Sequence, residues 1–201
     1  KTLSGVQCIG LEAAVQMVGF YERAGFQKDC ITTRRQMLFR SEASLDASPS
    51  QRSDVAVVPL REVSLEAIQR YDERHEISPR PHFLELWLRH RAGDVFAARD
   101  AEGECHGYVR IRPCLLPIGE GWRVGPWLAE DPGMASLLLN NALDHHNGVV
   151  LIDTPGHNPS AKTILSARGF KPMTSTVRMY KGVIPKGHDR NVYGLACLEL
   201  G

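Results

Sequence analysis

Residues 151–170 read LIDTPGHNPSAKTILSARGF, which predicts a short buried strand, a turn, a helix and a stop at Gly169-Phe170. Asn158 stands just before the expected helix and is predicted to be its N-cap. A similar unit opens the chain, where residues 8–26 read CIGLEAAVQMVGFYERAGF and again end in Gly-Phe. The two Gly-Phe pairs are 169 − 25 = 144 residues apart, which is a domain-sized repeat.

The composition is that of an ordinary globular chain. Of 201 residues, 43% are hydrophobic and 23% charged, and the net charge of +1 favours neither nucleic acid nor an anionic membrane as a partner. No run of about 20 apolar residues and no signal-peptide pattern is present, so a cytoplasmic location is expected. The five cysteines include no Cys-x-x-Cys pair, which favours free thiols and predicts no metal site.

The chain divides into three segments. Residues 1–40 predict β-α-β, with a strand over 6–11, a helix over 15–24 and a strand over 29–39. Residues 41–53 are polar and serine-rich, as expected of a linker. Residues 54–201 predict the order β-α-α-β-β-β-α-β-α-β-β, with Ser64 as a further N-cap and a final strand over 192–200.

This order resembles the GNAT (GCN5-related N-acetyltransferase) superfamily, and is most similar to its branch with two tandem GNAT-like halves and a C-terminal YitH-type domain. The motifs that carry the resemblance are Gly107–Cys114, Gly125–Pro132, Leu151–Pro155, Asn158–Ala161, Gly169-Phe170, Arg178–Tyr180 and Leu198–Gly201. The resemblance implies a mixed α/β fold with a largely antiparallel sheet flanked by helices. It implies one complete copy at 54–201 and the C-terminal remnant of another at 1–40.

The resemblance also implies a function. The full-length protein would transfer an acetyl group from acetyl-CoA to a small-molecule or peptide amine, with a homodimer as one possible assembly. In this family backbone amides at a helix start hold the pyrophosphate. The matching cofactor-binding positions here are Leu128, Gly133, Met134, Ala135, Ser136 and Asn158. Glu130 and Asp131 would oppose an anion at this loop, and Pro132 lacks an amide donor.

The catalytic groups expected by resemblance are a carboxylate base and a tyrosine acid. Glu12, at the end of the opening strand, is the candidate base. The family tyrosine lies four residues before the Gly of Gly-Phe, at Tyr21 in the opening unit, whereas Leu165 takes its place in the second. Tyr108 is the candidate acid if the second half is catalytic, and Tyr180 is an alternative.

Other interpretations of these residues remain open. The second half could be a catalytically degenerate module that binds acyl-CoA or a partner, or supports the first half or a dimer. Arg110, Arg112 and Arg123 could attract phosphates or simply be solvated. A hydrolase triad of Asp153, His157 and Ser160 is disfavoured, because all three fall near one turn and no Gly-x-Ser-x-Gly motif is present.

Overall fold

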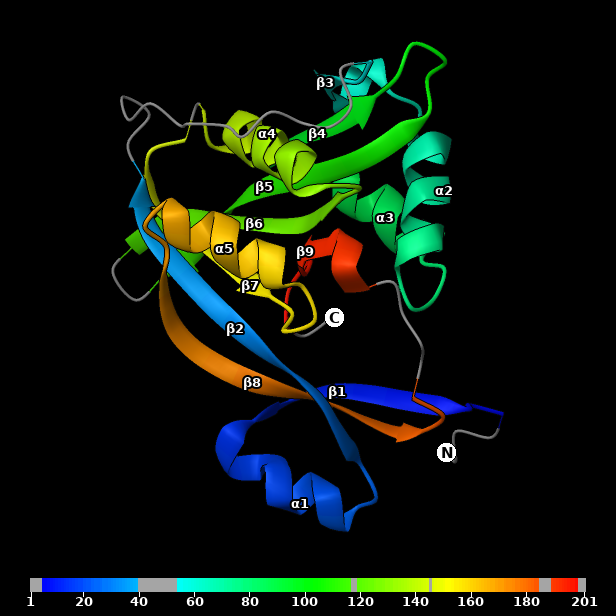
Figure 1. The fold of residues 1–201 in the computed structure, drawn as a ribbon, viewed down its shortest axis with the longest axis vertical. Coiled ribbons are helices and arrows are strands. Elements are labelled where there is room, and N and C mark those ends of the chain that lie inside the picture. The colour runs from blue at the N-terminus through cyan, green and yellow to red at the C-terminus, as the bar shows by residue number, and fades with distance from the viewer. Residues whose placement is uncertain (1–4, 40–53, 117–118, 145, 185–188, 199–201) are drawn as a thin grey trace.

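The computed structural model describes residues 5–39, 54–116, 119–144, 146–184 and 189–198, and its fold is shown in Figure 1. These residues form one nine-stranded sheet in the order β1-β8-β2-β7-β6-β5-β4-β3, with β9 paired to β6. The strands are β1 (Cys8–Ala14), β2 (Gln27–Phe39), β3 (Ala56–Pro59), β4 (Asp94–Arg99), β5 (Cys105–Leu116), β6 (Gly119–Ala129), β7 (Gly148–Thr154), β8 (Lys171–Gly182) and β9 (Val192–Gly194). Among the described pairs only β6–β7 is parallel, so the largely antiparallel sheet predicted from the sequence is confirmed.

Helices cover both faces of the sheet. They are α1 (Val18–Arg23), α2 (Leu65–His75), α3 (Pro81–Leu88), α4 (Pro132–Leu143) and α5 (Pro159–Ala167). Alternation along β5 separates two cores, because Val109 packs with α4 and α5 while Tyr108 packs with α2 and α3. In the part of the chain that the structure describes, no helix has the length and apolar character needed to cross a bilayer.

The opening strand–helix–strand unit is interleaved with the closing one. β2 lies between β7 and β8, and β8 lies between β1 and β2. Figure 1 shows β2 and β8 crossing together from the body of the sheet toward α1. Thr33 of β2, for example, is opposite Thr154 of β7 on one side and Ser175 of β8 on the other. The opening unit therefore shares one sheet with the rest of the described chain.

The two units end their helices with the same backbone motif. Gly25 has a φ of +89° and Gly169 a φ of +84°, a conformation that favours glycine. The amide that follows each glycine donates to a carbonyl five residues back, from Phe26 to Tyr21 and from Phe170 to Leu165, at 3.0 Å in both cases. Tyr21 and Leu165 therefore occupy equivalent positions in the two units.

β9 fills the gap where β6 and β7 diverge. These two strands pair over three residues each, ending at Val124 and Ile152. Beyond that point β9 pairs with β6, and the amide of Leu195 donates to the carbonyl of Asp153 on β7 at 2.9 Å. A side chain at Gly125 would place its Cβ 1.9 Å from the carbonyl oxygen of Leu195. The segment that follows β9 thus lies directly against β6 as well.

Side chains fix β9 in this gap. The Asn158 amide group donates to the carbonyls of Arg190 and Val192 at 2.8 and 3.0 Å. The ring of Tyr193 lies 5.1 Å from the ring of Trp127, centroid to centroid. Both rings and the Asn158 side chain are buried. Hydrogen bonds and aromatic packing therefore tie β9 to α5 and to β6.

Most local predictions agree with the structure. Ser64 caps α2 by accepting from Ala67 at 3.0 Å, and Asn158 caps α5 by accepting from Ala161 at 3.1 Å. The final strand predicted over 192–200 is wrong in length, because β9 ends at Gly194 and the next amide bonds to β7. The predicted linker at 41–53 lies outside the described residues.

Replacing Asn158 by Ala should destabilise the protein strongly. The loss of the cap costs about 1 kcal/mol, and leaving the two carbonyls of the β9 segment without their donor adds about 1–3 kcal/mol. Urea unfolding should therefore show a loss of about 2–4 kcal/mol. Ser160→Ala, in the first turn of the same helix, is the matched control, and equal losses in the two variants would contradict the role given to Asn158.

Candidate active site

A small pocket lies where β1, β2 and β8 meet the loops that follow α2 and β7. Glu12, Thr32, His157, Arg178 and Tyr180 are among its lining residues, and its volume is about 50 Å³. That space holds only a few non-hydrogen atoms. The pocket can therefore take the reacting end of a larger ligand rather than a whole cofactor.

The carboxylate of Glu12 lines this pocket and is held by several polar groups. Its side chain is 4% exposed. One oxygen accepts from the hydroxyl of Thr32 at 2.9 Å and the other from the hydroxyl of Thr176 at 2.6 Å. The guanidinium of Arg178 lies 3.7 Å away. Two hydroxyl donors and one cation thus replace the water that a surface glutamate would have.

Strand register brings these four residues together. Glu12 of β1 is directly opposite Arg178 of β8, and Thr32 of β2 is directly opposite Thr176 of β8. Directly opposite side chains on one face of a sheet lie close enough to interact, and the diagonal neighbours remain within reach. The site therefore depends on β8 lying between the two strands of the opening unit.

Burial raises the pKa of Glu12 above its ordinary value, although the two threonine hydroxyls and Arg178 oppose the shift. Asp153, a second carboxylate nearby, pushes the pKa in the same direction as burial. A carboxylate with a raised pKa binds a proton more tightly and is a better general base near neutral pH. The geometry thus suits Glu12 for accepting a proton inside the pocket.

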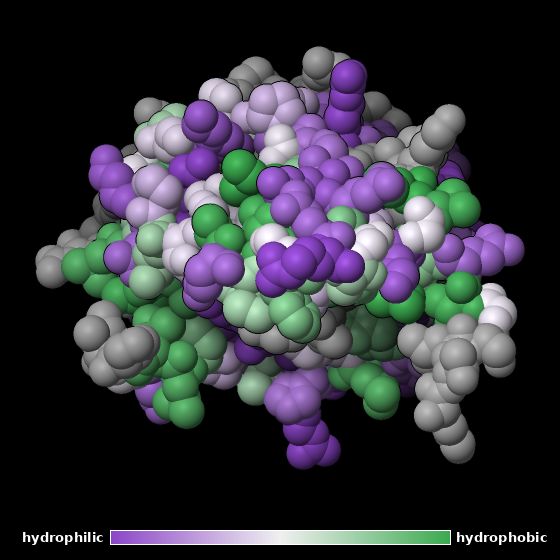
Figure 2. All heavy atoms as spheres, turned by 90° about the horizontal axis from the view of Figure 1, so that it is seen from below, coloured by the Kyte–Doolittle hydropathy of each residue, from purple (hydrophilic) through white to green (hydrophobic). Residues whose placement is uncertain are grey.

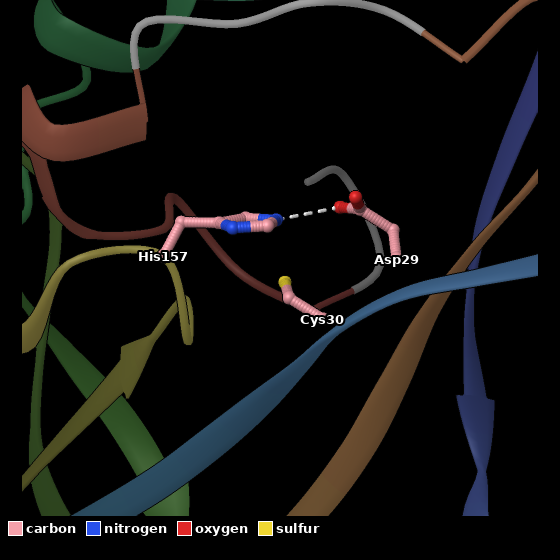
Figure 3. Close-up of side chains that lie close together, drawn as sticks. All are labelled: Asp29, Cys30 and His157. Carbon is pink, nitrogen blue, oxygen red and sulfur yellow. Dashed lines mark hydrogen bonds and ion pairs between the residues drawn. The ribbon is translucent and has the colours of Figure 1, made fainter.

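A second cluster lines the same pocket and consists of Asp29, Cys30 and His157, shown in Figure 3. The register of β2 shifts between Lys28 and Ile31, so Asp29 and Cys30 lie in a bulge that turns them toward the loop after β7. His157 Nε2 lies 2.9 Å from Asp29, and the ligand-type atoms of the three residues are all within 4.8 Å of one another. These are the side chains that could hold a metal ion in the described chain, although the sequence predicts no metal site.

The hydrolase triad is not assembled. Both carboxylate oxygens of Asp153 accept from Arg34, at 2.7 and 3.0 Å, and this carboxylate is almost fully buried. His157 instead faces Asp29, as described above. Asp153 and His157 therefore interact with different residues of β2, and Asp153 helps to bind β7 to that strand.

The three candidate tyrosines lie in different surroundings. Tyr21 packs edge-on against Phe20 and Phe26, with ring centroids 5.4 and 5.8 Å away. Tyr108 is completely buried and its hydroxyl donates to Asp72. Tyr180 lines the Glu12 pocket, and its hydroxyl accepts from Arg178 at 3.1 Å. Of the three, Tyr180 is the one placed beside Glu12.

The hydroxyl of Tyr108 belongs to a buried ion-pair network. Arg80 donates to both oxygens of Asp72, at 3.0 and 2.8 Å, and to Glu76 at 2.7 Å. Burial, followed by the negative charge of Asp72, raises the pKa of Tyr108 well above its ordinary value. The buried hydroxyl of Tyr108 thus joins β5 to α2, and this role fits its position better than donating a proton to a substrate.

Two of the residues predicted to bind the cofactor, Leu128 and Asn158, contact β9. Leu128 pairs with Val192, and Asn158 donates to the carbonyl of Val192. The helix-start residues are all buried: Gly133, Met134, Ala135 and Ser136. The amide of Met134 is already bonded to the side chain of Asp131 at 2.8 Å. Asp131, expected to repel an anion, thus acts as the N-cap of α4.

The sequence singled out Glu12 as a candidate but not the residues that surround it. Thr32, Thr176 and Arg178 are ordinary strand residues, and nothing in their local sequence indicates that they converge on one carboxylate. The repeat could have suggested these contacts, because the strands of two similar strand–helix–strand units can interleave in one sheet. Asp29 and His157 are 128 positions apart, and nothing in the sequence indicates that the two residues are in contact.

Replacing Glu12 by Gln should remove a pH-dependent loss of stability. Because the folded-state pKa lies above the ordinary value of 4.5, Glu12 favours folding most below that value and loses this contribution as pH rises through the folded-state pKa. Urea unfolding of the variant, relative to wild type, should therefore improve between about pH 4 and about pH 7. Glu22→Gln, an exposed change at a residue paired with Lys28, is the control. A wild-type-to-variant difference that stays constant with pH would contradict this prediction.

Comparisons with known proteins agree with this architecture. A curated relative, the holothin acyltransferase of a Pseudoalteromonas species, is 25% identical over 195 residues, which are 96% of this chain and 62% of that protein. A crystal structure of a candidate acetyltransferase from Pyrococcus horikoshii matches with a TM-score of 0.72 and 21% identity, over 98% of this chain and 60% of that one. A GCN5-related N-acetyltransferase from Anabaena variabilis matches with a TM-score of 0.57 and 13% identity, over 87% of this chain and 45% of that one.

The structural matches are too distant in sequence to show more than the fold. The chain spans less than two thirds of the length of each of these three relatives. The model of the Acetyltransferase (GNAT) domain family matches residues 68–194, which run from within α2 to the end of β9 and are more than half of the chain. The chain therefore belongs to the GNAT acetyltransferase domain family.

Proposed function

We propose that the full-length protein is an N-acyltransferase that moves an acetyl group from acetyl-CoA to an amine acceptor. Family membership supports acyl transfer, and the name of the Pseudoalteromonas relative describes acyl transfer as well. The single observation that carries the proposal is Glu12, a buried carboxylate with a raised pKa in the lining of a pocket. Small-molecule and peptide amines both fit this chemistry.

The proposed reaction is a direct transfer. The amine nitrogen attacks the thioester carbonyl carbon, the new N–C bond forms, and the C–S bond breaks. Glu12 accepts the proton that the nitrogen loses. The thiolate that leaves takes a proton from a tyrosine, for which Tyr21 holds the position of the family tyrosine. Arg178, 3.7 Å from Glu12, limits the rise in the pKa of that carboxyl group and so keeps it able to ionise.

The proposal places acyl-CoA on a preceding GNAT-like half, of which residues 1–40 form the closing part. Residues 41–53 would then be the linker, and 54–201 the second half, of YitH type. The shared helix ending at Gly25 and Gly169 and the interleaved strands support two copies of one design. The relatives are also longer than this chain, which supports a larger whole protein.

Exposed apolar side chains around α1 support the proposal that another part of the full-length protein packs against this surface. Val15, Phe20 and Ile31 are 61%, 54% and 58% exposed. A hollow of about 420 Å³ lies among them, with Val15, Val18 and Ile31 on its walls. In Figure 2, which views the molecule from the α1 side, hydrophobic patches flank a hydrophilic centre. Apolar area of this kind is typical of a surface that packs against another part of a protein.

A second candidate function concerns the 54–201 half on its own, as a module that supports the other half without binding acyl-CoA. The observation that favours it is β9. Ligands of sheets with parallel strands bind beyond the carboxyl ends of those strands, and here β9 occupies the space beyond β6 and β7. The bonded amide of Met134 further reduces the number of donors open to a pyrophosphate.

Replacing Glu12 by Gln in the full-length protein should lower kcat/KM for acetyl transfer by about 10²–10⁴-fold, because the variant cannot take the amine proton. Release of coenzyme A thiol from acetyl-CoA in the presence of an amine acceptor measures the rate. Glu22→Gln should retain wild-type activity. A Glu12→Gln variant that folds normally and keeps full activity across the pH range would overturn the role of Glu12.

Residues 1–201 alone should bind acetyl-CoA much more weakly than the full-length protein does. Calorimetric titration of both proteins under the same conditions measures the difference, and we expect a decrease of at least about tenfold. The reason is that β9 fills the gap where β6 and β7 diverge. Equal micromolar affinity in the two proteins would overturn the placement of acyl-CoA on a preceding half.

A further inference from the structure

A larger pocket lies on the face of the sheet that carries α2 and α3. Its volume is about 460 Å³, and it lies between α3 and the far half of β5. Its lining includes Phe83, Leu86, Trp87, Arg110, Arg112 and Pro113. It shares no lining residue with the Glu12 pocket. Its size falls within the range of small-molecule sites, roughly 300–1,000 Å³.

The walls of this pocket are mainly apolar and aromatic. The rings of Phe83 and Trp87, one helical turn apart on α3, are tilted against each other with centroids 5.1 Å apart. Leu86 is 78% exposed at the rim. Aromatic faces and an aliphatic rim favour a ligand with a flat apolar body.

Two cations flank the same tryptophan. The guanidinium carbons of Arg110 and Arg112 lie 5.3 and 4.9 Å from the centre of the Trp87 ring. The two arginines are two residues apart on β5, so both point to the α3 face. Their like charges destabilise each other, and burial followed by Arg112 lowers the pKa of Arg110 to about 10.

Arg110 is buried to an unusual degree for an arginine. It is 2% exposed, so of the two alternatives left open by the sequence, simple solvation does not apply to Arg110. One terminal nitrogen donates to the carbonyl of Ala92 at 2.9 Å, which fixes the loop after α3. Its buried Nε has no hydrogen-bond partner in the described residues. Within those residues no carboxylate forms an ion pair with Arg110. A buried arginine without a counter-charge is costly unless an anion joins it.

We propose that this pocket binds a small aromatic carboxylate, with the anionic group between Arg110 and Arg112 and the ring against Trp87 and Phe83. A carboxylate offsets the repulsion between the two guanidinium groups and matches their planar donors. The aromatic ring of the ligand buries the apolar lining of the pocket, which would stay exposed to water if an inorganic anion bound instead. The site is independent of the acyl-transfer proposal, because it uses none of the residues around Glu12.

The test is a calorimetric titration with 2-naphthoate, its neutral analogue 2-naphthylmethanol and inorganic phosphate, at constant ionic strength. We expect 2-naphthoate to bind at least about tenfold more tightly than either of the other probes. Only 2-naphthoate has both a negative charge for the two arginines and an aromatic body for the apolar lining. Arg112→Gln should weaken 2-naphthoate binding by about tenfold or more, whereas Arg89→Gln, an exposed change beside α3, should not. Arg112 is the residue to replace, since Arg110 also holds a loop.

Several results would overturn the proposal. They are binding of phosphate as tight as that of 2-naphthoate, equal binding of the neutral analogue, or an Arg112→Gln variant with normal folding and normal affinity. Failure of 2-naphthoate to bind, together with concentration-dependent dimerisation, would show that a second copy of the chain covers the face instead. Glu12→Gln should bind 2-naphthoate like wild type, so failure of this proposal and failure of the acyl-transfer proposal are distinguishable.

Discussion

The interleaving of β2 and β8 is the constraint on which the rest of the molecule depends. Each of these strands lies between two strands of the other strand–helix–strand unit. The pairing joins residues far apart in the chain, as in the ion pair of Arg34 with Asp153. The hydroxyl groups that stabilise the Glu12 carboxylate come from β2 and β8 as well. If either strand took a different place in the sheet, Glu12 would lose one of its two hydroxyl donors.

Features set by neighbouring residues could be predicted from the sequence. Ser64 and Asn158 act as caps because a side-chain oxygen reaches an amide three residues on, which local sequence reveals. The Gly-Phe stops were equally visible, because a residue with positive φ must end the helix. The mixed fold was implied by the resemblance of the element order and motifs to the GNAT superfamily.

Features set by contacts between distant strands could not be predicted in this way. The surroundings of Glu12, the bulge that turns Asp29 toward His157, and the buried position of Arg110 all depend on register between strands. Asp131 illustrates the same limit on a smaller scale. Its charge suggested repulsion of a phosphate, but the carboxylate serves the start of α4. Residue type alone did not distinguish a cap from an electrostatic barrier.

The order of strands also determines when the fold can form during synthesis. β1 and β2 precede their sheet neighbours β7 and β8 in the chain, and more than 100 residues separate the end of β2 from the start of β7. Pairing between such distant segments is slow. Before it pairs, a strand exposes backbone amides and carbonyls that have no hydrogen-bond partner in the sheet. The 13 residues of β2 are therefore without the neighbours they have in this sheet until β7 and β8 have been made. Until β7 and β8 are made, β2 must therefore be protected from pairing with other chains and from aggregation.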